Sequence, residues 1–225
     1  MRDFSEIIAL AAERQGGSRA LEDALATTPA LAPSAVAAIP EDRILAEMTR
    51  RTFNAGFSSK VIEAKWPAFE AAFKNFDPHA CAFMSEEHFE ALLQDHAIVR
   101  NGAKIKAVQV NAKLVLDLAA SHGSAARFFA NWPDKDHVGL LALLKERGSF
   151  LSGDGGMRFL RSLGKPAFIT TKDVVAALIR EGVISKAPSS KRDFATIQDV
   201  FNLWAGQSGR NLTEISRILA MSMGT

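Results

Sequence analysis

The chain has 225 residues, 48% of them hydrophobic, and its 27 basic and 25 acidic side chains leave a formal net charge of +2. A chain of this length can bury a sizeable core, as one domain or as two packed lobes. Its net charge is close to zero and therefore does not indicate a polyanionic partner. A single cysteine, Cys81, excludes a disulfide framework and indicates a reducing compartment. Because the apolar runs are shorter than a membrane span and the N-terminus lacks a signal-peptide core, we expect a cytoplasmic protein without a membrane partner.

The first 40 residues predict two short helices and a connector. Apolar residues at helical spacing indicate a first helix with Ser5 as its N-cap and a glycine pair at its end, and a second short helix follows. The next stretch, residues 29–40, is rich in alanine and proline and predicts a connector. We therefore treat residues 1–40 as an N-terminal helical extension that packs on a main body of residues 41–225.

The main body is helical by every local signal. Ser85 precedes two glutamates and predicts a helix N-cap. One long segment places apolar residues on a single stripe, formed by Ile105, Val108, Ala112, Val115 and Ala119. No alternating pattern is long enough to require a sheet, so we expect an all-α protein of about ten helices.

A glycine-rich corner within residues 148–164 interrupts the helical spacing of apolar residues. Its three glycines, Gly153, Gly155 and Gly156, permit positive φ angles and let the backbone approach a neighbour closely. Amides at the start of the following helix form an anion site that Arg158 can flank, and the carbonyls of the turn can face a monovalent cation. The spacing is typical of a helix–hairpin–helix element, which grips a DNA phosphate without reading sequence. The alternative is a tight helical corner that binds nothing.

The segment after this corner, RFLRSLGKPAFITTKDVVAAL, resembles the region that follows the hairpin in the helix–hairpin–helix DNA glycosylase superfamily. The resemblance implies a catalytic aspartate just before the next helix. Thr171 stands at that position and Asp173 lies two residues further on, so these two residues are the candidate catalytic groups. The alternative, which we favour for Asp173, is a first-turn acid in a helix capped by a threonine.

Residues 44–116 are similar, more specifically, to the DNA-3-methyladenine glycosylase I family. The matching stretches include AGFS, FDP and AIVRNGAKI, and they align with the family without an insertion or deletion between them. The resemblance implies a helix–hairpin–helix glycosylase fold with two helical lobes around a cleft. It also implies hydrolysis of the N-glycosidic bond of an alkylated purine, similar to 3-methyladenine, after the base is flipped out of duplex DNA. The alternative is a non-catalytic relative that binds DNA or senses lesions.

The resemblance also assigns candidate base-pocket residues. The family's pocket glutamate corresponds to Arg51, and its stacking aromatic corresponds to Ser59. Candidate stacking side chains are Phe53, Phe57 and Trp66, each with core packing as the alternative. Asn54 is the best-placed polar residue to read a base edge.

Candidate DNA contacts lie in two places: the hairpin residues Gly153, Gly155, Gly156 and Arg158, and the VRNGAKI stretch with Arg100, Asn101 and Lys104. For the second group the alternative is a solvated surface. We expect a monomer on double-stranded DNA. The family's structural zinc requires paired cysteines and histidines, and the single cysteine and scattered histidines of this chain predict no zinc. The monovalent cation at the hairpin is then the one small partner that the sequence suggests.

Overall fold

The computed structural model describes residues 1–223, and within them it contains helices and loops but no strand. The all-α prediction is therefore confirmed; the last two residues of the predicted main body lie outside the described residues. The α-helices of this range are α1 (Phe4–Gln15), α2 (Ser18–Ala26), α3 (Pro33–Ala37), α4 (Glu41–Asn54), α5 (Ser59–Ala72), α6 (Pro78–Ala82), α7 (Glu86–Gln94), α8 (Gly102–His122), α9 (Ala125–Asn131), α10 (His137–Arg147), α11 (Asp154–Ser162), α12 (Lys172–Arg180), α13 (Lys191–Ser208) and α14 (Leu212–Met221). Two 3-10 helices, η1 (Lys74–Phe76) and η2 (Asp134–Asp136), complete the set.

Local sequence signals explain most helix starts. Ser85 caps α7 as predicted, because its side chain accepts a hydrogen bond from the His88 amide. The predicted Ser5 cap is wrong by two residues: Asp3 caps α1 and forms a reciprocal capping box with Glu6. The predicted connector also contains the short helix α3, which has a proline in its first turn, where proline is well tolerated.

The described chain forms two compact units. The terminal unit contains residues 1–31, 133–139 and the chain from 166 on, and the central unit contains residues 32–132 and 140–165. These edges do not coincide with the predicted boundary at residue 40. The predicted arrangement of two lobes around a cleft stays a prediction.

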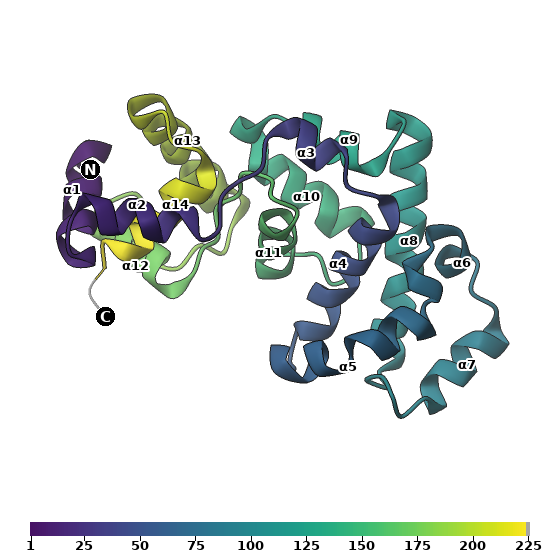
Figure 1. Ribbon diagram of the computed structural model, residues 1–225. Coiled ribbons are helices and arrows are strands. Elements are labelled where there is room, and N and C mark those ends of the chain that lie inside the picture. Colours follow the sequence, from purple (N-terminus) through teal and green to yellow (C-terminus); the bar gives the residue numbers. More distant parts are fainter. Residues whose placement is uncertain (224–225) are drawn as a thin grey trace. The chain divides into compact units, whose positions relative to one another are not determined.

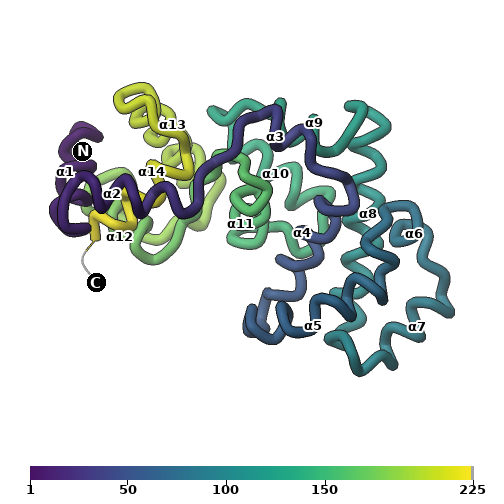
Figure 2. Tube along the Cα trace, in the orientation of Figure 1, coloured from purple at the N-terminus to yellow at the C-terminus, as the bar shows by residue number. Residues whose placement is uncertain are grey.

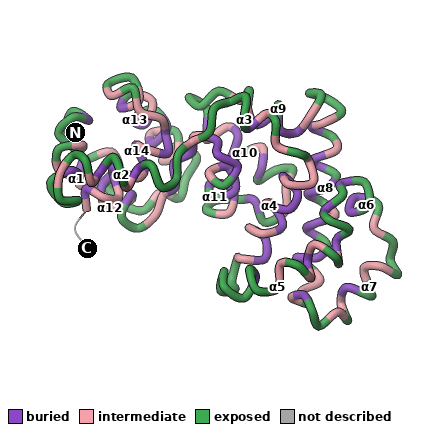
Figure 3. Tube along the Cα trace, in the orientation of Figure 1, coloured by how far each residue is buried: buried purple, intermediate pink, exposed green. Residues whose placement is uncertain are grey.

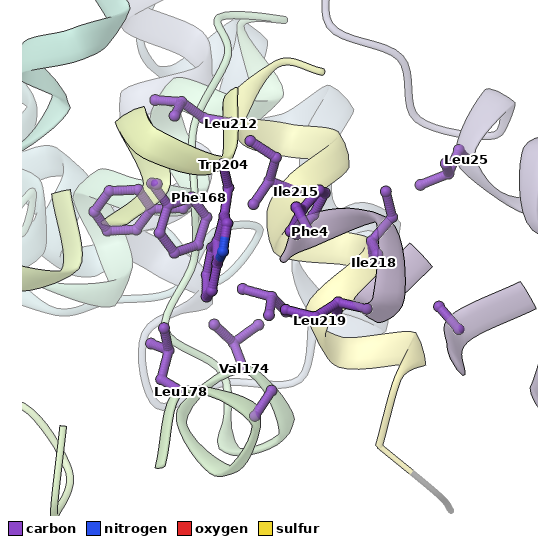
Figure 4. Close-up of a cluster of buried hydrophobic side chains, with 14 of the residues drawn as sticks. Phe4, Leu25, Phe168, Val174, Leu178, Trp204, Leu212, Ile215, Ile218 and Leu219 are labelled. Atoms are coloured by element: carbon purple, nitrogen blue, oxygen red, sulfur yellow. The ribbon is translucent and has the colours of Figure 1, made fainter. Parts of the chain in front are cut away.

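The terminal unit has a core made from both ends of the chain (Figure 4). Phe4 of α1 lies 5.4 Å, between ring centroids, from Trp204 of α13, and both side chains are fully buried. The Phe4 amide also donates to Gln207 Oε1 at 3.1 Å. Helices α12 and α14 complete this core beside α1 (Figure 1). The N-terminal helices are thus part of a shared core, because their apolar faces are buried against the C-terminal helices.

The central unit is built around α8, which packs against α4, α6, α7 and α9. The predicted stripe on α8 is buried at its first four positions and half-buried at Ala119, and Figure 3 shows buried positions recurring along this helix. The trace in Figure 2 passes from α3 into α4, and α3 packs on α9 while α11 packs on α4. Helix α4 therefore lies between the long central helix and the hairpin, which decides what lines the site.

Candidate functional site

A pocket of about 640 Å³ lies in the central unit, where the end of α4 faces the glycine-rich corner before α11. It contains four of the predicted base-pocket residues and two of the predicted hairpin residues. Its lining consists of Arg51, Asn54, Ala55, Phe57, Ser59, Phe150, Ser152, Asp154, Gly155 and Arg158. The structure thus brings together two groups of residues that the sequence predicted separately.

The turn after α4 forms one wall of this pocket. Helix α4 ends at Asn54, and Gly56 follows with a φ of 79°, which favours glycine. The amide of Phe57 then donates to the Asn54 carbonyl oxygen at 3.2 Å. This tight turn leaves the Phe57 side chain 42% exposed at the pocket, although large apolar side chains are usually buried.

Asn54 presents an unsatisfied acceptor in this wall. Its Oδ1 atom is buried and accepts no hydrogen bond from any residue in the described part of the chain. Buried polar atoms in folded proteins are nearly always paired, and leaving one unpaired costs about 1–3 kcal/mol. The unpaired oxygen marks Asn54 as a polar side chain of this wall that the fold itself does not satisfy.

Arg51 reaches the pocket with its charge already balanced. Its Nε donates to Glu47 Oε1 at 2.6 Å, one helical turn earlier on α4. Arg50 lies 3.5 Å from the other oxygen of the same carboxylate. The sequence did not indicate this pairing as part of the site, although an acid four residues before an arginine on a helix is a recognisable signal.

Lys104 supports the pocket turn from behind. Its side chain is almost fully buried, and its ammonium donates to the carbonyl oxygens of Phe53 (3.2 Å) and Ala55. Burial lowers the pKa of this ammonium below its usual 10.5. The same group lies 4.6 Å from the centroid of the Phe57 ring. Lys104 therefore caps the C-terminal end of α4, where a cation is favourable, and it does not lie on the surface where a DNA contact was expected.

The two neighbours predicted with it lie at the start of α8. The Asn101 side chain is the N-cap, and its Oδ1 accepts from the Lys104 amide at 3.1 Å. Arg100 is exposed, with Nη1 3.3 Å from His96 Nε2. Neither residue lines the pocket, and their contact with DNA stays a prediction.

The glycine-rich corner is a helix–turn–helix between α10 and α11. Gly153 is the N-cap of α11 with φ 54° and ψ −128°, a conformation that suits glycine. A Cβ atom on Gly155 would lie 2.7 Å from the Phe150 carbonyl oxygen, and one on Gly156 would collide with the Leu151 carbonyl oxygen. The glycines are therefore required by the packing of the turn itself. Arg158 is exposed and its Nε donates to Asp154 Oδ2 at 2.6 Å.

Asn111 anchors the corner to α8 and was not predicted to have a role in the site. Its Nδ2 donates to the Ser149 carbonyl oxygen at 3.1 Å, and its Oδ1 accepts from the Ser149 amide at 2.8 Å. The side chain is fully buried. An asparagine on the apolar stripe of a long helix is the sequence signal that was available, because a buried amide needs partners.

Two predicted pocket aromatics do not line this pocket. Phe53 is fully buried and packs edge-on against Phe69 with centroids 4.6 Å apart. Trp66 stacks on Phe69 and Phe76, and its Nε1 donates to Glu70 at 2.9 Å. Phe53 is therefore a core residue, and Trp66 packs half-buried between these rings and the Arg50 guanidinium, which lies 3.8 Å from its centroid.

The candidate catalytic residues lie in the terminal unit. Thr171 is the N-cap of α12 and its hydroxyl accepts from the Val174 amide at 3.3 Å. Asp173 is exposed in the first turn of the same helix. This is the arrangement expected of a capping threonine and a first-turn acid, and a catalytic role for either residue stays a prediction.

Neither a metal cluster nor a reactive thiol is found in the part of the chain that the structure describes. Within residues 1–223 no group of three or more His, Cys, Asp or Glu side chains is arranged to hold a metal ion. Cys81 is buried, which raises the pKa of its thiol to about 12, and its Sγ lies 3.3 Å from the Phe73 carbonyl oxygen. No helix in this range has the length and apolar character needed to cross a membrane.

Comparison with known proteins identifies the class of this region. Residues 36–141 match the model of the methyladenine glycosylase family, a range that includes the whole pocket turn and ends before the glycine-rich corner. The resemblance inferred from the sequence is thereby confirmed for residues 36–141.

Three known proteins are similar to parts of this chain. Over 64 residues the chain is 39% identical to DNA-3-methyladenine glycosylase 1 of Escherichia coli (strain K12), a match that spans 28% of this chain and 34% of that relative. A crystal structure of 3-methyladenine DNA glycosylase I is 26% identical, with a TM-score of 0.45, over 55% of this chain and 76% of that one. A solution structure of 3-methyladenine DNA glycosylase I is 25% identical, with a TM-score of 0.46, over 56% and 75%.

Proposed function

We propose that this protein is a DNA glycosylase that hydrolyses the N-glycosidic bond of an alkylated purine similar to 3-methyladenine. The damaged nucleotide would be flipped from duplex DNA into the central-unit pocket. One observation carries the proposal: the pocket joins Asn54 and Phe57, from the family-matched region, to Gly155 and Arg158 of the predicted hairpin.

The chemistry of such a lesion suits a pocket with few acid–base groups. Alkylation at a ring nitrogen makes the purine cationic, so the base is already a good leaving group. The enzyme must extrude the nucleotide, which costs a few kcal/mol, and contact with an aromatic ring returns about 1–3 kcal/mol per base. Phe57 offers an exposed ring for that contact, and the unpaired Asn54 Oδ1 atom can accept an N–H of the base once the Asn54 side chain turns toward it.

The two arginines that line the pocket are each paired with a carboxylate. Arg51 would repel a positively charged base, but its ion pair with Glu47 offsets this repulsion. Arg158 is likewise paired with Asp154. Within residues 1–223 the Lys104 ammonium behind the pocket turn bonds only to carbonyl oxygens, so it is the cation that a charged base would meet near Phe57.

Duplex binding would use the hairpin backbone. Helix α11 starts at Asp154, and its N-cap Gly153 has no side chain to bond the first amides. These amides are therefore available to a phosphate at the positive end of the helix dipole. Arg158 and Arg100 would add electrostatic attraction that does not depend on base sequence. We further propose that the protein acts as a monomer in the cytoplasm; a monovalent cation at the hairpin stays a prediction.

A single-turnover assay on duplex DNA treated with a methylating agent tests the proposed activity, with released bases identified by mass spectrometry. We expect release of an alkylated purine by the wild type. Asn54→Leu, which removes the acceptor at similar size, should slow release at least tenfold. Phe83→Leu is the matched control, because Phe83 is 75% exposed and does not line the pocket. Wild-type protein that binds duplex DNA but releases no base would refute the activity.

A non-catalytic DNA-binding or lesion-sensing protein is the second candidate. It is favoured by Thr171 and Asp173, which stand near the position that the resemblance assigns to a catalytic aspartate and have the geometry of helix capping. This candidate predicts salt-sensitive duplex binding in the same assay without release of a base.

A further inference from the structure

The pocket contains a second exposed aromatic side chain, which lies outside the family-matched region. Phe150, just before the hairpin glycines, is 41% exposed and lines the pocket together with Phe57, which is 42% exposed. Neither ring stacks on another aromatic side chain within residues 1–223. Two large apolar rings that remain exposed at one pocket indicate a ligand with aromatic faces.

The backbone holds Phe150 in a conformation that folding alone does not favour. Its φ is 60°, in the left-handed region that bulky residues rarely adopt. The residues on either side are anchored, since Asn111 bonds both backbone groups of Ser149 and Leu151 is fully buried. A glycine or asparagine would suit this position without strain. A phenylalanine in a strained backbone conformation, with its ring exposed, indicates that the ring contacts a bound ligand.

The two rings border the same small region. The Lys104 ammonium lies 4.6 Å from the Phe57 centroid and 5.9 Å from the Phe150 centroid, so the centroids are at most 10.5 Å apart. A planar base held between two rings needs roughly 3.5 Å on each side. The upper limit of 10.5 Å is compatible with one base in contact with both rings.

We propose that Phe150 contacts the flipped base and, with Phe57, forms an aromatic clamp for a single planar purine. The proposal rests on the proposed function and extends it, because it assigns base recognition to the hairpin as well as to the family-matched region. The turn that presents glycine amides to the phosphate also presents the Phe150 ring to the base. Binding of the base and binding of the DNA phosphate therefore depend on the same short segment of the protein.

The test measures binding of the free base and excision separately. Calorimetric titration with 3-methyladenine is carried out on the wild type, Phe150→Leu, Phe150→Trp and the control Phe83→Leu. The leucine keeps an apolar side chain and removes the aromatic face, so we expect affinity for the base to fall about tenfold, with KM for methylated duplex rising in parallel. The tryptophan should restore both. Affinity for undamaged duplex should stay within about twofold, because the hairpin backbone is unchanged.

Each outcome bears on the clamp independently of the activity. If the wild type binds 3-methyladenine through Phe150 but releases no base from DNA, the clamp stands and the glycosylase activity fails. If the wild type excises the base and Phe150→Leu matches it in KM and base affinity, the clamp is refuted and the activity stands. Failure of the wild type to bind the base at millimolar concentration also refutes the clamp. The tryptophan variant shows whether a loss in the leucine variant reflects the aromatic face or a misfolded turn.

Discussion

Replacing Lys104 with methionine tests how the pocket turn is held. Methionine keeps the length and apolar stem of lysine but cannot donate to the carbonyl oxygens of Phe53 and Ala55. Ala55 is exposed, so water can replace the donor there, whereas Phe53 is fully buried and its carbonyl loses its side-chain donor. An unpaired buried acceptor costs about 1–3 kcal/mol, and relief from burying an ammonium offsets part of this. We expect a net loss of about 1–2 kcal/mol in the free energy of unfolding.

The pH dependence gives this prediction a definite sign. Burial lowers the pKa of Lys104 in the folded protein below its usual 10.5, so between those two values the unfolded chain binds more protons than the folded one. Stability contributed by Lys104 therefore rises as pH increases through that window, and Lys104→Met lacks this contribution. The stability advantage of the wild type over the variant should increase as the pH rises toward 10.5.

Urea unfolding of both proteins at each pH measures the effect, with Lys106→Met as the matched control. Lys106 is exposed on the same helix, and its replacement should change stability by no more than about 0.5 kcal/mol. Lys104→Met should also weaken binding of 3-methyladenine, because the Phe57 turn loses its support. Equal stability of the variant and the wild type, or a difference that shrinks with rising pH, would refute the reasoning.

Four further substitutions separate fold from function. Gly155→Ala places a Cβ atom 2.7 Å from a carbonyl oxygen and should cost about 1–3 kcal/mol of stability together with duplex affinity, measured by unfolding and by fluorescence anisotropy; unchanged duplex binding would exclude the hairpin from DNA contact. Asn111→Ala removes both bonds to the hairpin backbone and should lower stability by about 1–3 kcal/mol while raising KM, which excision kinetics would reveal. Asp173→Asn should leave single-turnover excision within about twofold, whereas a hundredfold loss would assign it acid–base catalysis. Arg158→Gln should reduce the slope of duplex affinity against salt by about one, and an unchanged slope would remove it from phosphate contact.

The helices and the glycine-rich corner were predictable because their signals are local. Apolar periodicity on α8 is set by residues three and four positions apart, and the Ser85 cap bonds an amide three residues later. The pocket turn was singled out through a family resemblance, which was recognisable because the AGFS stretch is short and contiguous. A Cβ atom on Gly155 or Gly156 would collide with a backbone carbonyl oxygen only five residues earlier in the chain. In each case a short window of sequence contained both partners of the interaction.

The tertiary structure decided which side chains of these segments reach the pocket. Phe53 and Phe57 are one turn apart, yet the first is core and the second is exposed, because α4 ends between them. Lys104 is buried because its partners lie about fifty residues earlier on α4, and Asn111 is bonded to a turn 38 residues later. Phe150 becomes a pocket residue only when α11 packs on α4. The sequence by itself determined the helices, the caps and the tight turns, and contacts between distant segments determined the pocket, because a side chain's environment depends on partners that local periodicity does not encode.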